Sequence, residues 1–243
     1  MLGERTRTWI PIPGKLQEAV FVERPNRFLV RCRPLGEAEP VDAHLADPGR
    51  LRELLIPGVR IWLLPASGAK RKTRWTALLV ENPDRCGLVS VDTRIPNRLV
   101  GRALAQSAIE EFEDWEFRRA EATLGRSRID FLLGREDGRQ LALEVKSVTL
   151  VEDGVGLFPD AVTARGARHA RELAHLAQRD GWSAAILFVI QREDVRRFRA
   201  ARELDPDFAA ALDEARARGV QIVARRCRID VDRVTLGGTV PVN

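Results

Sequence analysis

The chain has 243 residues, with 40 basic and 35 acidic side chains and a formal net charge of +5. Its hydrophobic content of 44% supports a packed core and excludes a disordered tail, and no apolar run reaches the roughly 18–20 residues of a membrane span. The three cysteines are far apart in no CxxC pattern, which excludes a disulfide framework and a zinc knuckle. The N-terminal segment lacks the apolar stretch of a secretory signal. We therefore expect a cytoplasmic protein with no membrane partner.

The basic excess is confined to the N-terminal part of the chain. Residues 1–100 carry 17 basic against 11 acidic side chains, whereas the remaining residues carry 23 against 24. This asymmetry predicts a polyanion partner for the N-terminal part, and nucleic acid is the usual one. The alternative is compositional drift, because 36 of the 40 basic residues are arginine.

Short apolar segments separated by Gly, Pro and Asn fill the first part of the chain. This pattern is typical of a small all-β barrel or sandwich, which we assign to residues 1–88. The predicted strands flank Arg24-Pro25-Asn26 within residues 18–33 and then follow at 41–46, 59–66, 74–81 and 88–93, with a short helical turn around Leu51–Leu55.

The pattern changes near residue 97, so we place a domain boundary within residues 86–100. Apolar residues then recur at helical spacing or in short runs, which predicts an α/β domain with a mixed sheet over residues 89–243. Its helices are predicted at 97–115, 163–181 and 206–219, and its strands at 128–133, 140–151, 183–191 and 220–229. Because helices alternate with strands, a helix-turn-helix protein is not indicated.

Three charged residues stand out in the predicted hairpin. Glu144 and Lys146 are two positions apart on one strand and share a face, and Asp130 lies on the partner strand. Burying these charges among apolar neighbours is costly unless they pair or bind a metal. Two carboxylates suit Mg²⁺ or Mn²⁺, and a lysine can stabilise charge developing on a phosphate. The pattern predicts phosphodiester hydrolysis; the alternative is an ion pair on a solvated strand face.

Several long segments, in the right order, resemble the sugar fermentation stimulation protein A family. They include SRIDFLL, LEVKSVTL, LFPDAVTARGARHARELAHLA, ERPNRFLV and VDTRIPNRLV. The resemblance implies an OB-like N-terminal barrel and a restriction-endonuclease-like C-terminal domain of the PD-(D/E)xK type. It also implies DNA binding, and catalytic roles for Asp130, Glu144 and Lys146. A further acid from the preceding helix is expected in that family, and Glu111 is the best match. One departure is Ala46–Arg50, where many members resemble Pro-Asn-Thr-Gly.

The segment that follows the hairpin offers phosphate and substrate contacts. Arg165 could hold a phosphate, His169 could orient substrate or water, and the resemblance also favours a site role for Asp160. Thr163 is expected to cap the helix.

A second basic run precedes a predicted barrel strand. Lys70, Arg71, Lys72 and Arg74 are followed by Trp75, and Arg27 could extend the patch. OB barrels bind nucleic acid through basic grooves and stacking aromatic side chains. The alternative is an exposed loop whose tryptophan begins a core strand.

The sequence therefore predicts a DNA-binding, Mg²⁺- or Mn²⁺-dependent nuclease. Asp130 and Glu144 would hold the cation, Lys146 would activate water, and Glu111 would complete the acidic cluster. RNA is the alternative substrate, and a homodimer is compatible with the sequence. The competing function is a non-enzymatic DNA-binding regulator of sugar metabolism genes on a nuclease-like scaffold; a third is an RNA-processing or repair factor with the same site.

Overall fold

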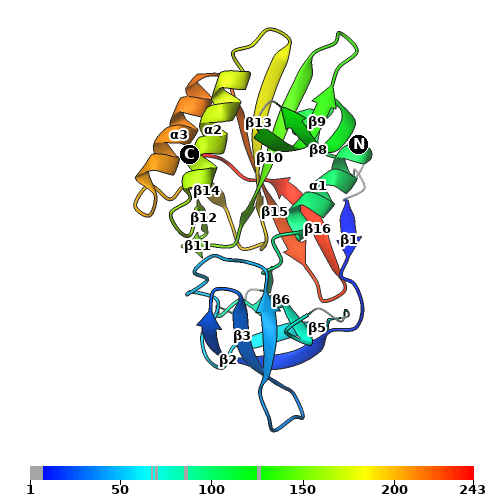
Figure 1. Ribbon diagram of the computed structural model, residues 1–243, viewed down its shortest axis with the longest axis vertical. Helices are drawn as coiled ribbons and strands as arrows, with labels where there is room; N and C mark the ends of the chain where they lie inside the picture. Colours follow the sequence, from blue (N-terminus) through cyan, green and yellow to red (C-terminus); the bar gives the residue numbers. More distant parts are fainter. Residues whose placement is uncertain (1–7, 67, 69–70, 85–86, 125–126) are drawn as a thin grey trace.

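The computed structural model describes residues 8–66, 68, 71–84, 87–124 and 127–243. It has two domains stacked along the long axis of the molecule, a barrel below and an α/β domain above (Figure 1). Within the described part of the chain, no helix is long and apolar enough to cross a membrane.

The lower domain has six strands, five of which form a closed barrel while the sixth pairs with its last strand. Its strands pair in the order β4-β3-β2-β5-β6-β7, and an additional parallel pairing of β4 with β6 closes the ring. Buried and outward-facing residues alternate along β3 and β5, as expected for strands that line a small barrel. This confirms the predicted OB-like architecture. The strands are β2 (Gln17–Asn26), β3 (Leu29–Pro34), β4 (Val41–Leu45), β5 (Arg60–Pro65), β6 (Trp75–Glu81) and β7 (Leu88–Ser90).

The upper domain is built on a seven-stranded mixed sheet in the order β1-β16-β15-β13-β10-β9-β8. The neighbours β10, β13 and β15 run parallel, and the remaining pairs are antiparallel. This confirms the predicted mixed sheet. The strands are β1 (Trp9–Pro11), β8 (Glu116–Leu124), β9 (Ser127–Gly134), β10 (Gln140–Val148), β13 (Trp182–Ile190), β15 (Gln221–Ile229) and β16 (Arg233–Thr239); β11 (Val151–Glu152), β12 (Val155–Phe158) and β14 (Arg197–Ala200) form a small separate sheet.

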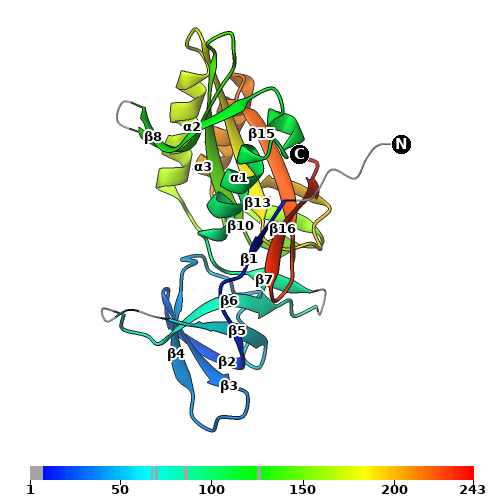
Figure 2. The same ribbon diagram turned by 90° about the vertical axis from the view of Figure 1, so that its right-hand side faces the viewer.

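Helices cover both faces of the large sheet (Figures 1 and 2). Helices α2 (Ala164–Leu176) and α3 (Pro206–Ala217) pack together on one face, and α1 (Ile95–Ala105) packs on the other. The predicted helix 97–115 is shorter than expected, because the left-handed backbone of Ser107 follows its end. A short 3-10 turn, η1 (Glu110–Phe112), comes next.

The two domains share one apolar layer. Leu78 and Leu79 of β6 lie in the same buried cluster as Ile95 and Leu99 of α1. Removing this surface from water stabilises the contact between barrel and sheet. The shared layer therefore fixes the loops of the barrel against the sheet of the upper domain.

The first described strand departs from the predicted division of the chain. β1 pairs with β16 at the edge of the upper sheet, so residues 9–11 belong to the upper domain although they precede the barrel in the chain. The pairing covers an otherwise open sheet edge.

Candidate active site between the domains

A cleft of ≈ 720 Å³ opens between the two domains. The upper domain contributes the middle of β9, the C-terminal half of β10, the start of α1 and the connection from β12 to α2. The barrel contributes the turn between β2 and β3 and the loop after β4. Its charged and amide side chains are Arg27, Asp47, Asn97, Asp130, Glu144, Lys146, Asp160 and Arg165.

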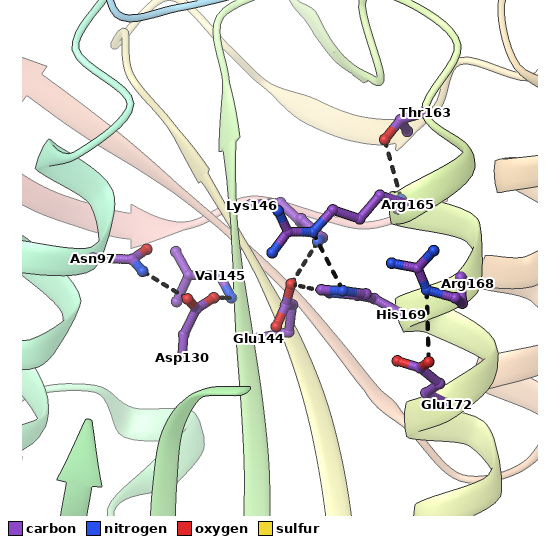
Figure 3. Close-up of polar contacts among 11 residues, drawn as sticks. Asn97, Asp130, Glu144, Val145, Lys146, Thr163, Arg165, Arg168, His169 and Glu172 are labelled. Carbon is purple, nitrogen blue, oxygen red and sulfur yellow. Dashed lines mark hydrogen bonds and ion pairs between the residues drawn. The ribbon is translucent and has the colours of Figure 1, made fainter. Parts of the chain in front are cut away.

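Asp130 lies in the middle of β9 and is held there by two donors. Its Oδ2 accepts a hydrogen bond of 2.7 Å from the backbone N–H of Val145, and its Oδ1 accepts one of 2.8 Å from Nδ2 of Asn97 (Figure 3). Burial, together with the nearby negative charge of Glu144, raises the pKa of this carboxyl above its ordinary value. Two carboxylates are thus placed close together in a partly desolvated position.

Glu144 lies on β10 and is buried. Its Oε1 is 2.7 Å from Nζ of Lys146 and 2.8 Å from Nδ1 of His169 (Figure 3). Both contacts involve the same oxygen, so Oε2 is the oxygen that remains to ligate a cation. The spacing of two residues along the strand places Glu144 and Lys146 on one face, as the sequence predicted.

Helix α2 delivers His169 to this group. Thr163 caps the helix by accepting a hydrogen bond of 3.1 Å from the N–H of Gly166, which confirms the predicted cap. Arg165 lies in the first turn of the helix and lines the cleft. Its Nε is 3.4 Å from Nε2 of His169, which lies one turn further along. Helix α2 therefore places His169 against the carboxylate of Glu144, and Arg165 next to His169.

A second pair of carboxyl groups lies across the cleft, with Asp47 on the barrel side and Asp160 on the side of the upper domain. Burial and the neighbouring Asp160 raise the pKa of Asp47 to about 6, although the N–H of Gly49 donates to its Oδ1 at 2.8 Å. The pKa of Asp160 is raised as well, mainly by burial. A side chain at Gly49 would place its Cβ 1.8 Å from Oδ2 of Asp160, so this close approach of the two domains requires glycine.

The donor set fits a hard divalent cation. Asp130 and Glu144 supply carboxylate oxygens, and a cation would relieve their repulsion. Among the described residues, no group of three or more His, Cys, Asp and Glu side chains is spaced to hold a metal by itself. A cation here would thus take two protein carboxylates and complete its shell with water and substrate oxygens, which is the habit of Mg²⁺.

The position of Glu111 differs from the sequence prediction that it completes the acidic cluster. Its Oε2 lies 2.6 Å from Nη1 of Arg225, and its Oε1 accepts a hydrogen bond of 2.7 Å from Thr239. Both oxygens are thus occupied by the C-terminal strands, and Glu111 does not line the cleft. The residue serves as the partner of a nearly buried arginine.

The predicted basic run lies apart from the cleft. Lys70 is outside the described residues, and Arg71, Lys72 and Arg74 are exposed in the connection from β5 to β6. Trp75 is half-buried against the barrel core, which leaves less of its ring for stacking. The role of this run in nucleic-acid binding stays a prediction.

Two contributors were missed from sequence. Asn97 orients Asp130, and its only sequence signal is an amide in the first turn of α1, directly after Pro96. The loop at Asp47 reaches the cleft although it departs from the family pattern.

Comparisons with known proteins cover both domains. Residues 22–91 match the family model described as SfsA N-terminal OB domain, and residues 94–233 match the one described as Sugar fermentation stimulation protein RE domain. The sugar fermentation stimulation protein homolog of Shouchella clausii is 46% identical over 93% of this chain and 97% of its own length; that of Moorella thermoacetica is 45% identical over 93% and 96%.

A solved structure agrees over almost the whole chain. The structure of Pyrococcus furiosus SfsA in complex with Ca²⁺ superposes with a TM-score of 0.85 and 29% identity, covering 97% of this chain and 99% of that one.

Proposed function

Since this chain belongs to the sugar fermentation stimulation protein family, we propose that it is a DNA-binding nuclease that hydrolyses phosphodiester bonds with Mg²⁺ or Mn²⁺. The observation that carries the proposal is the convergence of Asp130, Glu144 and Lys146 on one interdomain cleft. RNA is the alternative substrate.

The pair of carboxylates is the strongest argument for chemistry. A protein that only binds nucleic acid gains nothing from two partly desolvated carboxylates, because they repel phosphate. Asp130 and Glu144 would hold the divalent cation, which supplies electrostatic stabilisation of a phosphate in the transition state. The relative from Pyrococcus furiosus was solved with Ca²⁺, a hard cation that takes the same kind of oxygen ligands.

The remaining residues have separate roles. The ammonium of Lys146 lies 2.7 Å from Oε1 of Glu144 and lines the cleft, where it would orient an attacking water and stabilise negative charge on the phosphate. His169 holds Glu144 in position from α2, and Arg165 places a second positive charge on the wall of the cleft. These contacts position the carboxylate and the phosphate before chemistry begins.

One observation favours a non-enzymatic DNA-binding regulator as the second candidate. Lys146 and His169 both contact Glu144, so this buried carboxylate has partners without a cation. Such an ion-pair cluster can simply maintain a fold.

The two functions are separated by a cleavage assay. Purified protein is incubated with single-stranded and double-stranded DNA and with RNA, in Mn²⁺, Mg²⁺ or EDTA. The nuclease predicts cleavage that requires the cation and is lost in Glu144→Gln. A protein that binds these nucleic acids but cuts none of them with either cation would favour the regulator.

A further inference from the structure

A second hollow of ≈ 450 Å³ lies on the barrel side of the cleft, and all of its charged side chains are arginines. It shares Arg27, Pro48, Gly49 and Ala161 with the cleft, so the two hollows adjoin. We call it the arginine groove, defined by Arg24, Arg27, Arg50 and Arg52.

Three of these arginines are available to a ligand. Arg27, Arg50 and Arg52 are exposed, and none of them forms an ion pair with a carboxylate of the described residues. The contrast with neighbouring Arg31 is direct, since Arg31 is paired with both Glu23 and Asp42. Arg50 is near enough to Asp160 to offset part of the rise in pKa that burial causes at that carboxyl, but no carboxylate of the described residues pairs directly with these three arginines. The arginine groove therefore presents positive charge that is only partly offset by the chain itself.

The fourth arginine makes the groove rigid. The guanidinium of Arg24 donates to the carbonyl of Arg27 at 2.8 Å and to those of Gly49 and Arg50 at 2.7 Å each. These bonds tie the turn between β2 and β3 to the loop after β4. The backbone at Arg27 and Arg50 is thus held in place, which lowers the entropy lost when a ligand binds.

An aromatic ring stands at the edge of the groove. Phe28 is 48% exposed, and Cζ of Arg27 lies 5.7 Å from the centre of its ring. Proteins bind single-stranded nucleic acid through basic grooves that follow the backbone and aromatic rings that stack on unpaired bases. In a duplex the bases are already stacked on each other, so Phe28 has no partner there.

We propose that the arginine groove and Phe28 bind a single nucleic-acid strand and lead it into the cleft between the domains. The inference deepens the proposed function, because it names the substrate class of that site. Arg27, Arg50 and Arg52 contact consecutive phosphates, and Phe28 stacks on a base. The run from Arg71 to Trp75, which the sequence favoured, is not the main binding surface.

Binding is measured in EDTA, so that the result is independent of cleavage. Fluorescence anisotropy with labelled dT and rU oligonucleotides and with a DNA duplex compares the parent, a variant with Arg27, Arg50 and Arg52 changed to Ala, and Phe28→Ala. A matched control removes three exposed arginines from elsewhere, Arg33, Arg179 and Arg216. A further variant carries Lys72→Ala and Arg74→Ala.

The groove variant should lose at least tenfold in affinity for the single strands, and its plot of log K against log salt should be flatter by about 2, since each phosphate contact contributes about 0.7. Phe28→Ala should lose about tenfold, and the matched control should stay within about threefold of the parent. A loss of affinity in the groove variant for either oligonucleotide supports the proposal. The oligonucleotide that the parent binds more tightly shows whether the preferred strand is DNA or RNA.

Three results would overturn it, and the first two are equal losses in the groove variant and the matched control, or a greater loss when Lys72 and Arg74 are changed. Tighter binding of the duplex through the groove residues would also reject it. Cleavage by the parent in Mn²⁺ is scored separately, so failure of the groove and failure of the nuclease are distinguishable.

Discussion

Asn97, in the first turn of α1, donates a hydrogen bond of 2.8 Å to Asp130, which lies 33 residues further along the chain on β9. The contact joins the helix that follows the barrel to the carboxylate at the centre of the cleft. It supports the charged form of a carboxyl whose burial opposes that form.

Removing this donor should weaken the cation site without unfolding the protein. We expect Asn97→Ala to lower Mn²⁺ affinity about 10-fold, the lower end of the usual effect of residues that orient a metal ligand. Isothermal titration calorimetry measures it, with the exposed neighbour Arg98→Ala as control. Equal affinities in the two variants would show that Asn97 does not support the site.

Asp130 and Glu144 should be required jointly for cation binding. Asp130→Asn and Glu144→Gln each remove one anionic ligand, so Mn²⁺ binding should become undetectable by calorimetry in either variant. Circular dichroism controls for folding, because one asparagine oxygen cannot accept from both Val145 and Asn97 as Asp130 does. Folded variants that bind Mn²⁺ like the parent would refute the assignment.

Substitutions of Lys146 should abolish cleavage while leaving the affinity for nucleic acid nearly unchanged. Lys146→Ala should reduce the cleavage rate at least 100-fold, since the proposed mechanism relies on its ammonium to stabilise charge on the phosphate. Lys146→Arg should fail similarly, because a planar guanidinium does not replace a compact ammonium 2.7 Å from Glu144. Affinity for nucleic acid should change less than threefold in both. If cleavage persists in Lys146→Ala, the lysine has only a structural role.

Substitution of Glu111 should lower the stability of the protein and leave the cation site intact. The ion pair with Arg225 has side chains only 15% and 9% exposed, so Glu111→Ala leaves a nearly buried charge without its partner. We expect the free energy of unfolding to fall by about 3 kcal/mol. Urea denaturation measures this loss, and calorimetry should show unchanged Mn²⁺ affinity. Loss of Mn²⁺ binding in folded protein would restore Glu111 to the acidic cluster.

Local patterns were sufficient to predict the centre of the fold and of the site. The apolar run of β13 and the hairpin that carries Asp130 and Glu144 follow directly from strand periodicity. The family resemblance added the OB-like type of the barrel and the restriction-endonuclease-like type of the α/β domain. In contrast, β8 has the sequence EFRRAEATL, and β16 contains Gly237 and Gly238, so neither has the pattern of a buried strand. Their place is determined by pairing with neighbours distant in sequence.

Long-range contacts explain the site residues that the sequence assigned wrongly or missed. Glu111 is matched to Arg225 across 114 positions, and nothing near Glu111 in the chain indicates that partner. The approach of the loop at Gly49 to Asp160 depends on how the two domains pack. Residue spacing describes one strand or helix at a time, so contacts between domains are not contained in it.

The carboxylate of Asp47 should make stability depend on pH. Its pKa is raised to about 6 in the folded protein, mainly by burial, against an ordinary value of 3.8. A raised carboxyl pKa means that the folded state binds the proton more tightly, so the stabilisation is complete below pH 3.8 and is lost as pH rises through about 6. At pH 7.5 the parent carries a buried charge that Asp47→Asn removes, and the amide oxygen can still accept from the N–H of Gly49.

We therefore expect Asp47→Asn to match the parent near pH 4 and to exceed its free energy of unfolding by about 2–3 kcal/mol at pH 7.5. Urea denaturation at several pH values measures the difference, and exposed Asp180→Asn should show none of it. A variant that is less stable than the parent at pH 7.5 would mean that attraction between the Asp47 carboxylate and nearby Arg24 outweighs the cost of burial. In that case the loop is held to the cleft by charge, and acid rather than base should loosen it.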